Sequence, residues 1–217
     1  MEPVDGKRYG FVNGVVSGQT KGQWLFVDPG FTGDSGGLPV RSNQAWLYQG
    51  SKLLAHSASG VVSVKHISFS TRWYRLRIVA SRGSAATLSK SLIVTYNFQA
   101  HALSGGLSYS PDEFLPRIVP RFLSGTNAAA PGSRTTVPIW FGTGGGVVPV
   151  TVHGVQVAVS ANGGKNWYLL RVSGSGSQRS VTVTNPRNAG YVSLRISATD
   201  ADGTSVSLVV FNAYRVS

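Results

Sequence analysis

The sequence predicts an all-β protein made of two tandem β-sandwich domains of the immunoglobulin-like or fibronectin-III-like type. Three observations lead to this prediction: short runs that alternate apolar and polar residues, abundant Gly, Ser, Thr and Val, and a long internal repeat. Alternation with a period of two residues is typical of strands with one buried face. No segment has the uninterrupted helical period and the caps of a long helix.

The internal repeat relates the two halves of the chain. Residues 74–83 are echoed by residues 192–200, with Leu76 matching Leu194 at an offset of 118 residues. Earlier in each half, Gly50 and Gly164 stand at the turn of a predicted hairpin, where a positive φ is needed. A repeat of about 115 to 119 residues has the size of one β-sandwich and is too long for a solenoid unit.

The repeat divides the chain into three parts. We expect a first β-sandwich over residues 1–104, a Pro-rich packed connector over 105–122, and a second, Ig-like β-sandwich over 123–217. Three prolines keep the connector extended. Its apolar residues predict that it packs against both domains: Leu115, Ile118, Val119 and Phe122.

Residues 33–37, GDSGG, match the letters around the nucleophilic serine of trypsin-like proteases. A nucleophilic serine needs a base, which precedes it in the trypsin-like chain order, yet all four histidines follow Ser35. Gly, Asp and Ser between two apolar stretches are typical of a loop. We therefore expect Ser35 to be a loop residue, with no catalytic residues in this chain and no enzymatic activity.

The composition indicates a folded, basic protein. Hydrophobic residues make up 41% of the chain, and 20 Lys and Arg against 8 Asp and Glu give a net charge of +12. Such a surface attracts polyanions, although the charge also keeps a Gly-rich β protein soluble and protects sheet edges. There is no cysteine, no apolar stretch as long as a membrane span, and no apolar core of a signal peptide at the start.

Two sets of side chains are candidates for ligand binding. Arg72, Arg75, Arg77, Arg82 and Lys90 would form one basic sheet face that binds a polyanion, or else they are solvated arginines and a lysine on an outer face. Alternation places Tyr74 on the face opposite Arg75. The aromatic candidates, which would stack on a sugar or belong to the core, are Trp46, Trp73 and Trp167.

The sequence predicts no metal site and no cofactor. Asp200 and Asp202 precede Gly203 in a pattern that resembles the start of a calcium loop, which makes them weak candidates. No bidentate glutamate follows, so a plain hairpin turn is the preferred interpretation. His56 and His66 lie ten residues apart, which is not a spacing that fixes a metal.

Several motifs resemble the C-terminal accessory β-sandwich regions of large secreted subtilisin-like serine proteases of actinobacteria. Residues 46–57 are similar to the family's "LYRDGKLV" turn, and residues 73–82 to the "YRL...ASR" strand that follows it. Further matches lie in residues 135–139 ("TVPV"), 157–167 ("VSxDGGKTW"), 185–195 ("NPxGAGYVSLR") and 198–203 ("ATDxxGN"). The family's acidic turn residues appear here as Gln49 and Asn162, which weakens any inherited calcium site.

The resemblance implies a non-catalytic module of an extracellular multidomain protein, with the catalytic triad in a separate upstream domain. We expect docking or adhesion, with a partner protein or the upstream protease domain as the first candidate. A polysaccharide or polyanionic surface is the alternative ligand, and a structural subunit of an assembly is the alternative role. We expect neither a membrane span nor sequence-specific nucleic-acid binding.

Overall fold

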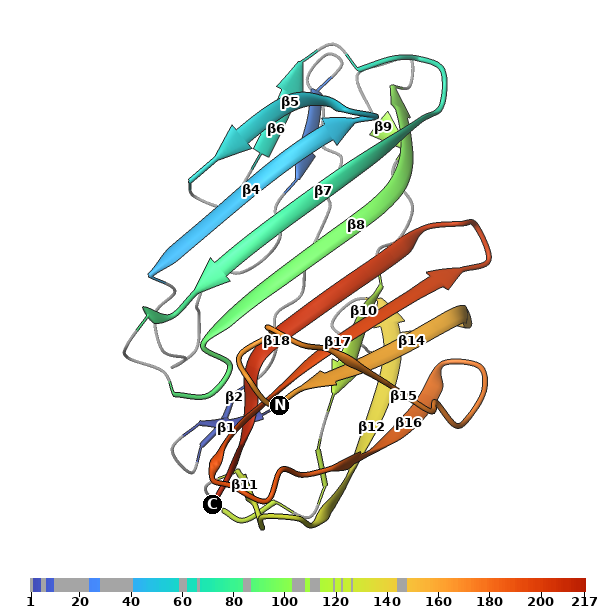
Figure 1. Cartoon of the computed structure of the whole chain (residues 1–217). Helices are drawn as coiled ribbons and strands as arrows, with labels where there is room; N and C mark the ends of the chain where they lie inside the picture. The colour runs from blue at the N-terminus through green and yellow to red at the C-terminus, as the bar shows by residue number, and fades with distance from the viewer. Residues whose placement is uncertain are drawn as a thin grey trace.

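The computed structural model describes residues 2–4, 7–9, 24–27, 41–58, 62–65, 67–83, 87–102, 108–109, 114–118, 120–121, 123–125, 127–143 and 148–217. These residues form strands and turns with no α-helix among them, which confirms the all-β prediction (Figure 1). The strands are β1 (Glu2–Val4), β2 (Lys7–Tyr9), β3 (Trp24–Val27), β4 (Ser42–Gln49), β5 (Lys52–Ser57), β6 (Val62–Lys65), β7 (Arg72–Ser81), β8 (Ser91–Ala102), β9 (Ser108–Tyr109), β10 (Leu115–Ile118), β11 (Ala128–Ala129), β12 (Arg134–Thr143), β13 (Val148–Pro149), β14 (Val152–Ser160), β15 (Tyr168–Leu170), β16 (Gln178–Thr184), β17 (Gly190–Asp200) and β18 (Ser205–Val216).

One large sheet runs through both halves of the chain. Its strand order is β15-β14-β17-β18-β8-β7-β4-β5, with β11 beside β18 and β9 beside β8. Figure 1 shows these strands side by side, from the first half at the top to the second half at the bottom. The hairpin turns predicted at Gly50 and Gly164 are present, with φ values of +59° and +85°.

The second half has the strand order of an immunoglobulin-like sandwich. In that fold the second and fifth strands pair in one sheet, while the third, sixth and seventh form the other. Here β12 pairs with β16 in the smaller sheet, and β14, β17 and β18 are neighbours in the large sheet, extended by β15. The short strand β11 runs parallel to β18. The smaller sheet is completed by β10 and β13, which both pair with β12.

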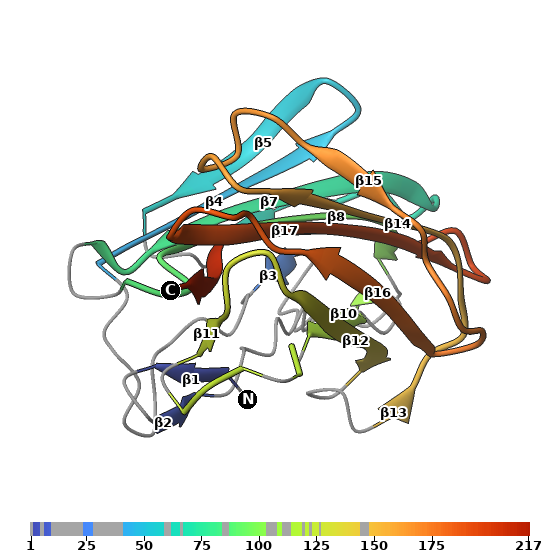
Figure 2. The ribbon, with the colours of Figure 1, turned by 60° about the horizontal axis from the view of Figure 1, so that its bottom comes forward.

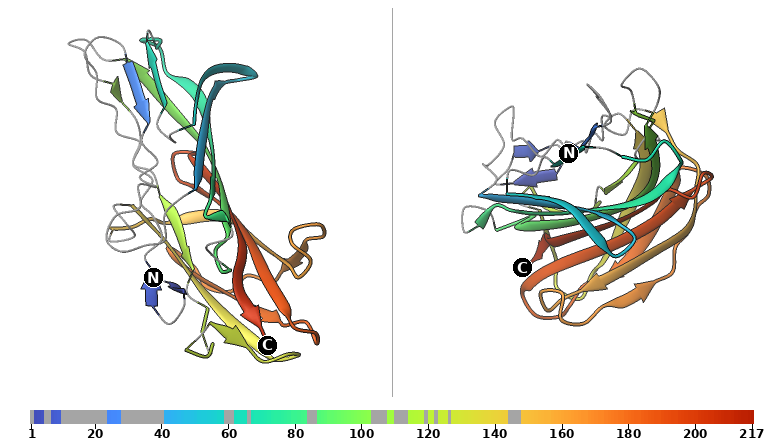
Figure 3. Two further views of the ribbon diagram at one scale, coloured as in Figure 1. Left: turned by 90° about the vertical axis from the view of Figure 1, so that its left-hand side faces the viewer. Right: turned by 90° about the horizontal axis from the view of Figure 1, so that it is seen from above.

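The first half repeats the same order. Strands β5, β4, β7 and β8 correspond to β15, β14, β17 and β18, and the pair β3–β6 corresponds to β12–β16. Both smaller sheets lie on the same side of the large sheet, as Figure 2 shows for β3, β10, β12 and β16, and the side views of Figure 3 agree. The two halves are therefore immunoglobulin-like units that share one sheet.

The junction between the halves is the antiparallel pair β8–β18. Its central residues are Val94 and Leu208, which face each other across the two strands. Val94 pairs on its other side with Ile78, and Leu208 with Ile196, which is the repeat-equivalent of Ile78. An approximate twofold axis therefore passes through the Val94–Leu208 pair, perpendicular to the sheet. All four side chains are at most 5% exposed.

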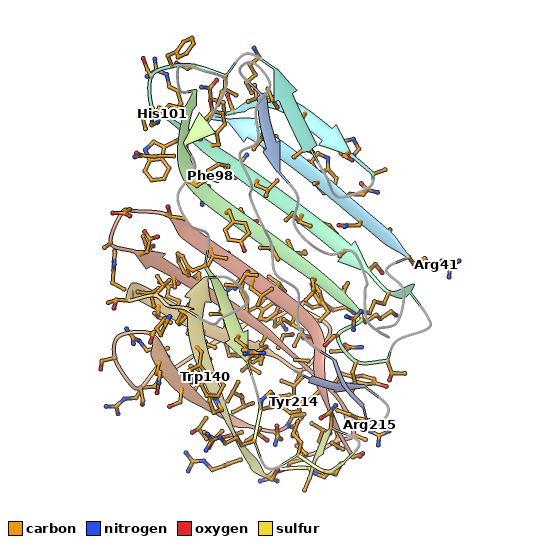
Figure 4. The ribbon with its side chains drawn as sticks, turned by 180° about the vertical axis from the view of Figure 1, so that it is seen from behind. Arg41, Phe98, His101, Trp140, Tyr214 and Arg215 are labelled. Atoms are coloured by element: carbon orange, nitrogen blue, oxygen red, sulfur yellow. The ribbon has the colours of Figure 1, made fainter. Side chains whose placement is uncertain are left out.

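The core lies between the large sheet and the smaller sheets. Alternate residues of the large sheet, such as Leu76, Phe98 and Leu194, point to this side and are fully buried, in one core with Val137 and Ile139 of β12. Figure 4 is seen from this side and labels Phe98 on β8. Burial of the core residues removes apolar surface from water, which is the main force that holds such a sandwich together.

Part of the expected connector is a strand of the second half. Strand β10 pairs with β12, with Ile118 opposite Ile139. Just before it, Phe114 is fully buried and meets the Phe141 ring edge-on, with ring centroids 6.2 Å apart. The predicted packing of Val119 and Phe122 lies outside the described residues. The domain boundaries at residues 104 and 123 stay a prediction.

A buried polar network fixes the end of β18 against the smaller sheet. The Asn185 amide donates to the hydroxyl oxygens of Ser133 (2.9 Å) and Thr135 (2.8 Å). The Tyr214 hydroxyl donates to the Asn185 side-chain oxygen at 2.8 Å. Burial raises the pKa of Tyr214 far above its ordinary value, because the phenolate would lose its hydration.

Replacing Leu208 by alanine tests the shared sheet. The change removes a buried side chain from the junction, so the free energy of unfolding is expected to fall by about 2–5 kcal/mol. Calorimetry should show one transition at a lower temperature, because the core of both halves is continuous with this site. Ser207→Ala, on the other face of the same strand, should change stability by less than about 0.5 kcal/mol. Two separate transitions, of which only one moves, would contradict the shared sheet.

Replacing Tyr214 by phenylalanine tests the buried network through its pH dependence. A folded-state pKa above the unfolded value of about 10 means that the stability contribution is complete below pH 10 and is lost as the pH rises further. At about pH 8 the variant should lose about 1–3 kcal/mol, because the Asn185 oxygen loses its donor. Between about pH 9 and 11 its stability should fall less than that of the unmodified chain, as measured by urea unfolding. Burial also raises the pKa of Tyr74, so some alkaline loss remains. An equal alkaline loss in both proteins would show that Tyr214 is not the group responsible.

Candidate functional site

The candidate site is the face of the large sheet that points away from the smaller sheets, which we call the outer face. Figure 1 is seen from this side. The registers of the paired strands place alternate residues on it, and two contacts described below add Trp167 from the β14–β15 loop. The residues on it include Trp46, Tyr48, His56, Trp73, Arg75, Arg77, Ile93, Thr95, Asn97, Trp167, Arg195, Ser197, Ser205, Ser207, Val209 and Phe211.

The first half contributes aromatic rings and arginines to the outer face. Trp46 pairs with His56 across β4 and β5, and the two rings stack with centroids 5.1 Å apart. The Arg75 guanidinium lies over the ring of Tyr48, 4.7 Å from its centroid. Arg77, opposite Trp46 on the neighbouring strand, is exposed. The positive charge of Arg75 is therefore stabilised by the aromatic ring beneath it.

The second half repeats this combination with different residues. The Arg195 guanidinium lies 5.1 Å from the ring centroid of Trp167, which in turn meets Phe211 edge-on at 6.5 Å. Hydrogen bonds hold the preceding loop: the Ser160 hydroxyl accepts from Gly164 N–H at 2.9 Å. Since Gly164 has a positive φ and packs against Phe211, a side chain here would collide with that ring.

The middle of the outer face crosses the junction between the halves and combines polar pairs with one apolar pair, Ile93 and Val209. Thr95 on β8 faces Ser207 on β18, and beside them the Asn97 amide donates to the Ser205 hydroxyl at 3.0 Å. Trp73 lies over the turn between β17 and β18 and is 46% exposed. The backbone pairing of β8 with β18 makes this surface continuous from one half to the other.

The predicted basic residues do not gather at one place. Arg75 and Arg77 lie on the outer face, whereas Arg72 has the opposite alternation and is exposed at the start of β7. Arg82 and Lys90 lie at the far end of the β7–β8 pair, joined by a backbone hydrogen bond of 2.9 Å. Tyr74 is buried on the other face, as predicted.

The three predicted tryptophans, in contrast, share the outer face. Trp46 and Trp167 are half-buried there, and Trp73 is more exposed. Trp140 projects from β12 on the far side of the smaller sheet (Figure 4). Single tryptophans on separate strands did not reveal this common face, because the face exists only when the strands are placed in order. Arg195 was missed as a site residue, although the repeat offset of 118 makes it the equivalent of Arg77.

The weak calcium candidates have a different role in the structure. Asp200 is 8% exposed, and one of its carboxylate oxygens accepts the N–H groups of Asp202 (3.0 Å) and Thr204 (2.9 Å). Burial raises its pKa, and these hydrogen bonds oppose the rise. The carboxylate therefore closes the β17–β18 turn, while Asp202 is exposed. No group of three metal-ligating side chains occurs in the described residues.

Two predicted features lie outside the described residues: the loop around Ser35 and the histidine His66. His56 stacks on Trp46. His101 lies 3.4 Å from the Thr71 hydroxyl, measured from its Nδ1 atom. The described part of the chain contains no helix long and apolar enough to cross a membrane.

No protein-family model and no curated protein matches this chain. Among solved structures, a chimeric titin Z1Z2–Z1Z2 tandem functionalized with a GRGDS peptide from fibronectin is 14% identical. The match covers 91% of this chain and 93% of the titin chain, with a TM-score of 0.29. The amphioxus IgVJ-C2 molecule is 13% identical over 90% of this chain and 99% of its own, with a TM-score of 0.21. Both scores are low, so the immunoglobulin-like assignment rests on the strand order.

Proposed function

We propose that this chain is a non-catalytic interaction module and that the outer face of the large sheet binds its partner. One observation carries the proposal: the joined sheet presents arginine and aromatic side chains in both halves on one continuous surface. Trp73, Arg77 and Arg195 are exposed on it. Arginine and aromatic side chains are enriched in binding surfaces, where they contribute contact area and directed polar contacts.

The setting that we propose is an extracellular multidomain protein, where the module docks or adheres. This part of the proposal is supported by the sequence motifs that resemble accessory regions of secreted subtilisin-like proteases. A protease domain is then one candidate partner, and a polysaccharide or polyanionic surface is the other.

Assembly of several chains through sheet edges is a second candidate function, favoured by strand β15. It lies at one end of the large sheet, and its residues Tyr168 and Leu169 are 66% and 71% exposed. Exposed apolar edge strands are prone to pair with another chain. Light scattering would detect such an assembly as a molar mass that increases with protein concentration.

Placing a glutamate in the middle of the outer face tests the proposed function. Ser207→Glu puts a charged side chain on the face without removing any arginine. The panel would contain immobilised acidic and neutral polysaccharides, DNA and a subtilisin-type protease domain, at about 50 and 500 mM salt. The unmodified chain should be retained by at least one, and Ser207→Glu should weaken that retention by about tenfold or more.

Thr182→Glu is the matched control, since it adds the same charge to an exposed position of β16 in the smaller sheet. Its retention should stay close to that of the unmodified chain. Equal losses for both variants, or no retention by any member of the panel, would overturn the proposal. Circular dichroism of both variants would show that the fold is intact.

A further inference from the structure

The charges of the outer face have one sign. Arg75, Arg77 and Arg195 are exposed there. In the described part of the large sheet, the side-chain carboxylates are confined to the β17–β18 turn, at Asp200 and Asp202, and that of Asp200 accepts backbone N–H groups. Charge complementarity therefore favours an anionic ligand.

Two of these guanidinium groups are already held in place. Arg75 rests on Tyr48 and Arg195 on Trp167, at 4.7 and 5.1 Å from the ring centroids. A guanidinium held over an aromatic ring loses less freedom when it binds an anion, which lowers the entropic cost of binding. The rings covered in this way are less available for stacking on a neutral sugar. Of the outer-face tryptophans, Trp73 is the one with a large exposed fraction, 46%.

The arginines are spaced widely and symmetrically. Arg77 and Arg195 are repeat equivalents on β7 and β17, on opposite sides of the twofold axis through Val94 and Leu208. Three strand spacings and two residues along the strand place their backbones about 16 Å apart. Between them the row that begins at Arg77 continues with the hydroxyl groups of Thr95, Ser207 and Ser197, and the row that ends at Arg195 contains the apolar side chains of Ile93 and Val209.

This spacing discriminates between classes of polyanion. A nucleic acid strand carries one phosphate per about 3.4 Å and is bound by dense clusters of Lys and Arg, which the outer face lacks. Peptides bind along a sheet edge, as a helix in a groove or, for acidic motifs, at a cluster of arginines, whereas Arg77 and Arg195 lie far apart. A polysaccharide with carboxylate or sulfate groups offers widely spaced charges for the arginines and many hydroxyl groups for the hydroxyl row beside them.

We propose that the outer face binds a linear acidic polysaccharide, which crosses the β8–β18 junction with one anionic group at Arg77 and another at Arg195. The inference rests on the proposed function of this face. Arg75 adds a third cation beside Arg77. Each half of the protein contributes one end of the site, so neither half alone would bind the polysaccharide at both arginines.

The test measures the affinity of the full chain for polygalacturonate, a carboxylated polymer, and for dextran sulfate, a sulfated one, by isothermal titration calorimetry. Arg77→Ala and Arg195→Ala should each weaken binding to at least one of these by about fivefold or more, and should lower the salt dependence by about one counterion each. Disaccharide fragments, which are too short to reach both arginines, should bind much more weakly than the polymer.

The matched control is the double variant Arg134→Ala, Arg187→Ala, which removes two exposed arginines that are not on the outer face. Its affinity should change by less than about twofold. An equal loss for the control and for Arg77→Ala, Arg195→Ala would overturn the proposal, because binding would then follow net charge alone. Binding of DNA or neutral dextran as tightly as of the acidic polymers would overturn it as well.

The Ser207→Glu variant distinguishes a wrong ligand class from a wrong binding face. If it blocks binding of DNA, a neutral polysaccharide or the protease domain while the arginine variants have no effect, the outer face is the site and the ligand class is wrong. If neither Ser207→Glu nor the arginine variants affect any binding, both the ligand class and the face are wrong.

Discussion

The antiparallel pairing of β8 with β18 is the constraint on which the rest of the molecule depends. In an immunoglobulin-like sandwich the last strand is an edge strand, with a row of unpaired backbone groups. Here the last strands of the two halves, β8 and β18, pair with each other, from Ser91 opposite Phe211 to Asn97 opposite Ser205. Each strand thus supplies hydrogen-bond partners for the backbone groups at the other's edge. Two further backbone hydrogen bonds extend the junction, from the N–H groups of Ser89 and Lys90 to the carbonyls of Asn212 and Phe211. The pairing removes two edges and gives the halves a fixed relative position.

The same pairing creates the surface to which we assign binding. Side chains on one half alone would offer a short face of four strands, with one group of aromatic rings and arginines. Joined through β8 and β18, the halves bring Arg77 and Arg195 onto one face, with a row of hydroxyl groups and an apolar pair between them. The approximate symmetry of the sheet thus becomes an approximate symmetry of the proposed site. It suits a ligand with a repeating structure better than a compact one.

Much of the fold follows from local sequence patterns. The alternation in residues 74–79 correctly separates buried Tyr74 and Leu76 from exposed Arg75 and Arg77, because a strand turns successive side chains to opposite faces. Gly50 and Gly164 mark hairpin turns because few other residues adopt a positive φ without strain. These features depend on a few neighbouring residues, so the sequence displays them directly.

The site depends on which strands become neighbours, and alternation does not contain that information. Strand β8 carries apolar residues on one face and Ile93, Thr95 and Asn97 on the other, a pattern that fits an edge strand and a central strand equally well. The predicted basic set therefore combined Arg75 and Arg77 with Arg82 and Lys90, which are near in sequence, and left out Arg195, which is near in space. The repeat offset was the one signal that pointed to Arg195.

Hydrogen exchange at the junction tests the shared sheet most directly. If β8 and β18 pair, the amide groups of residues 91–97 and 205–211 that point toward the partner strand should exchange as slowly as those between β7 and β8. The intact protein would be labelled for short and long times and then digested. Mass spectrometry would measure the exchange of the peptides that contain β8 and β18. Rapid exchange of those amides, with protection left only at the amides that face β7 and β17, would contradict the pairing and with it the continuous outer face.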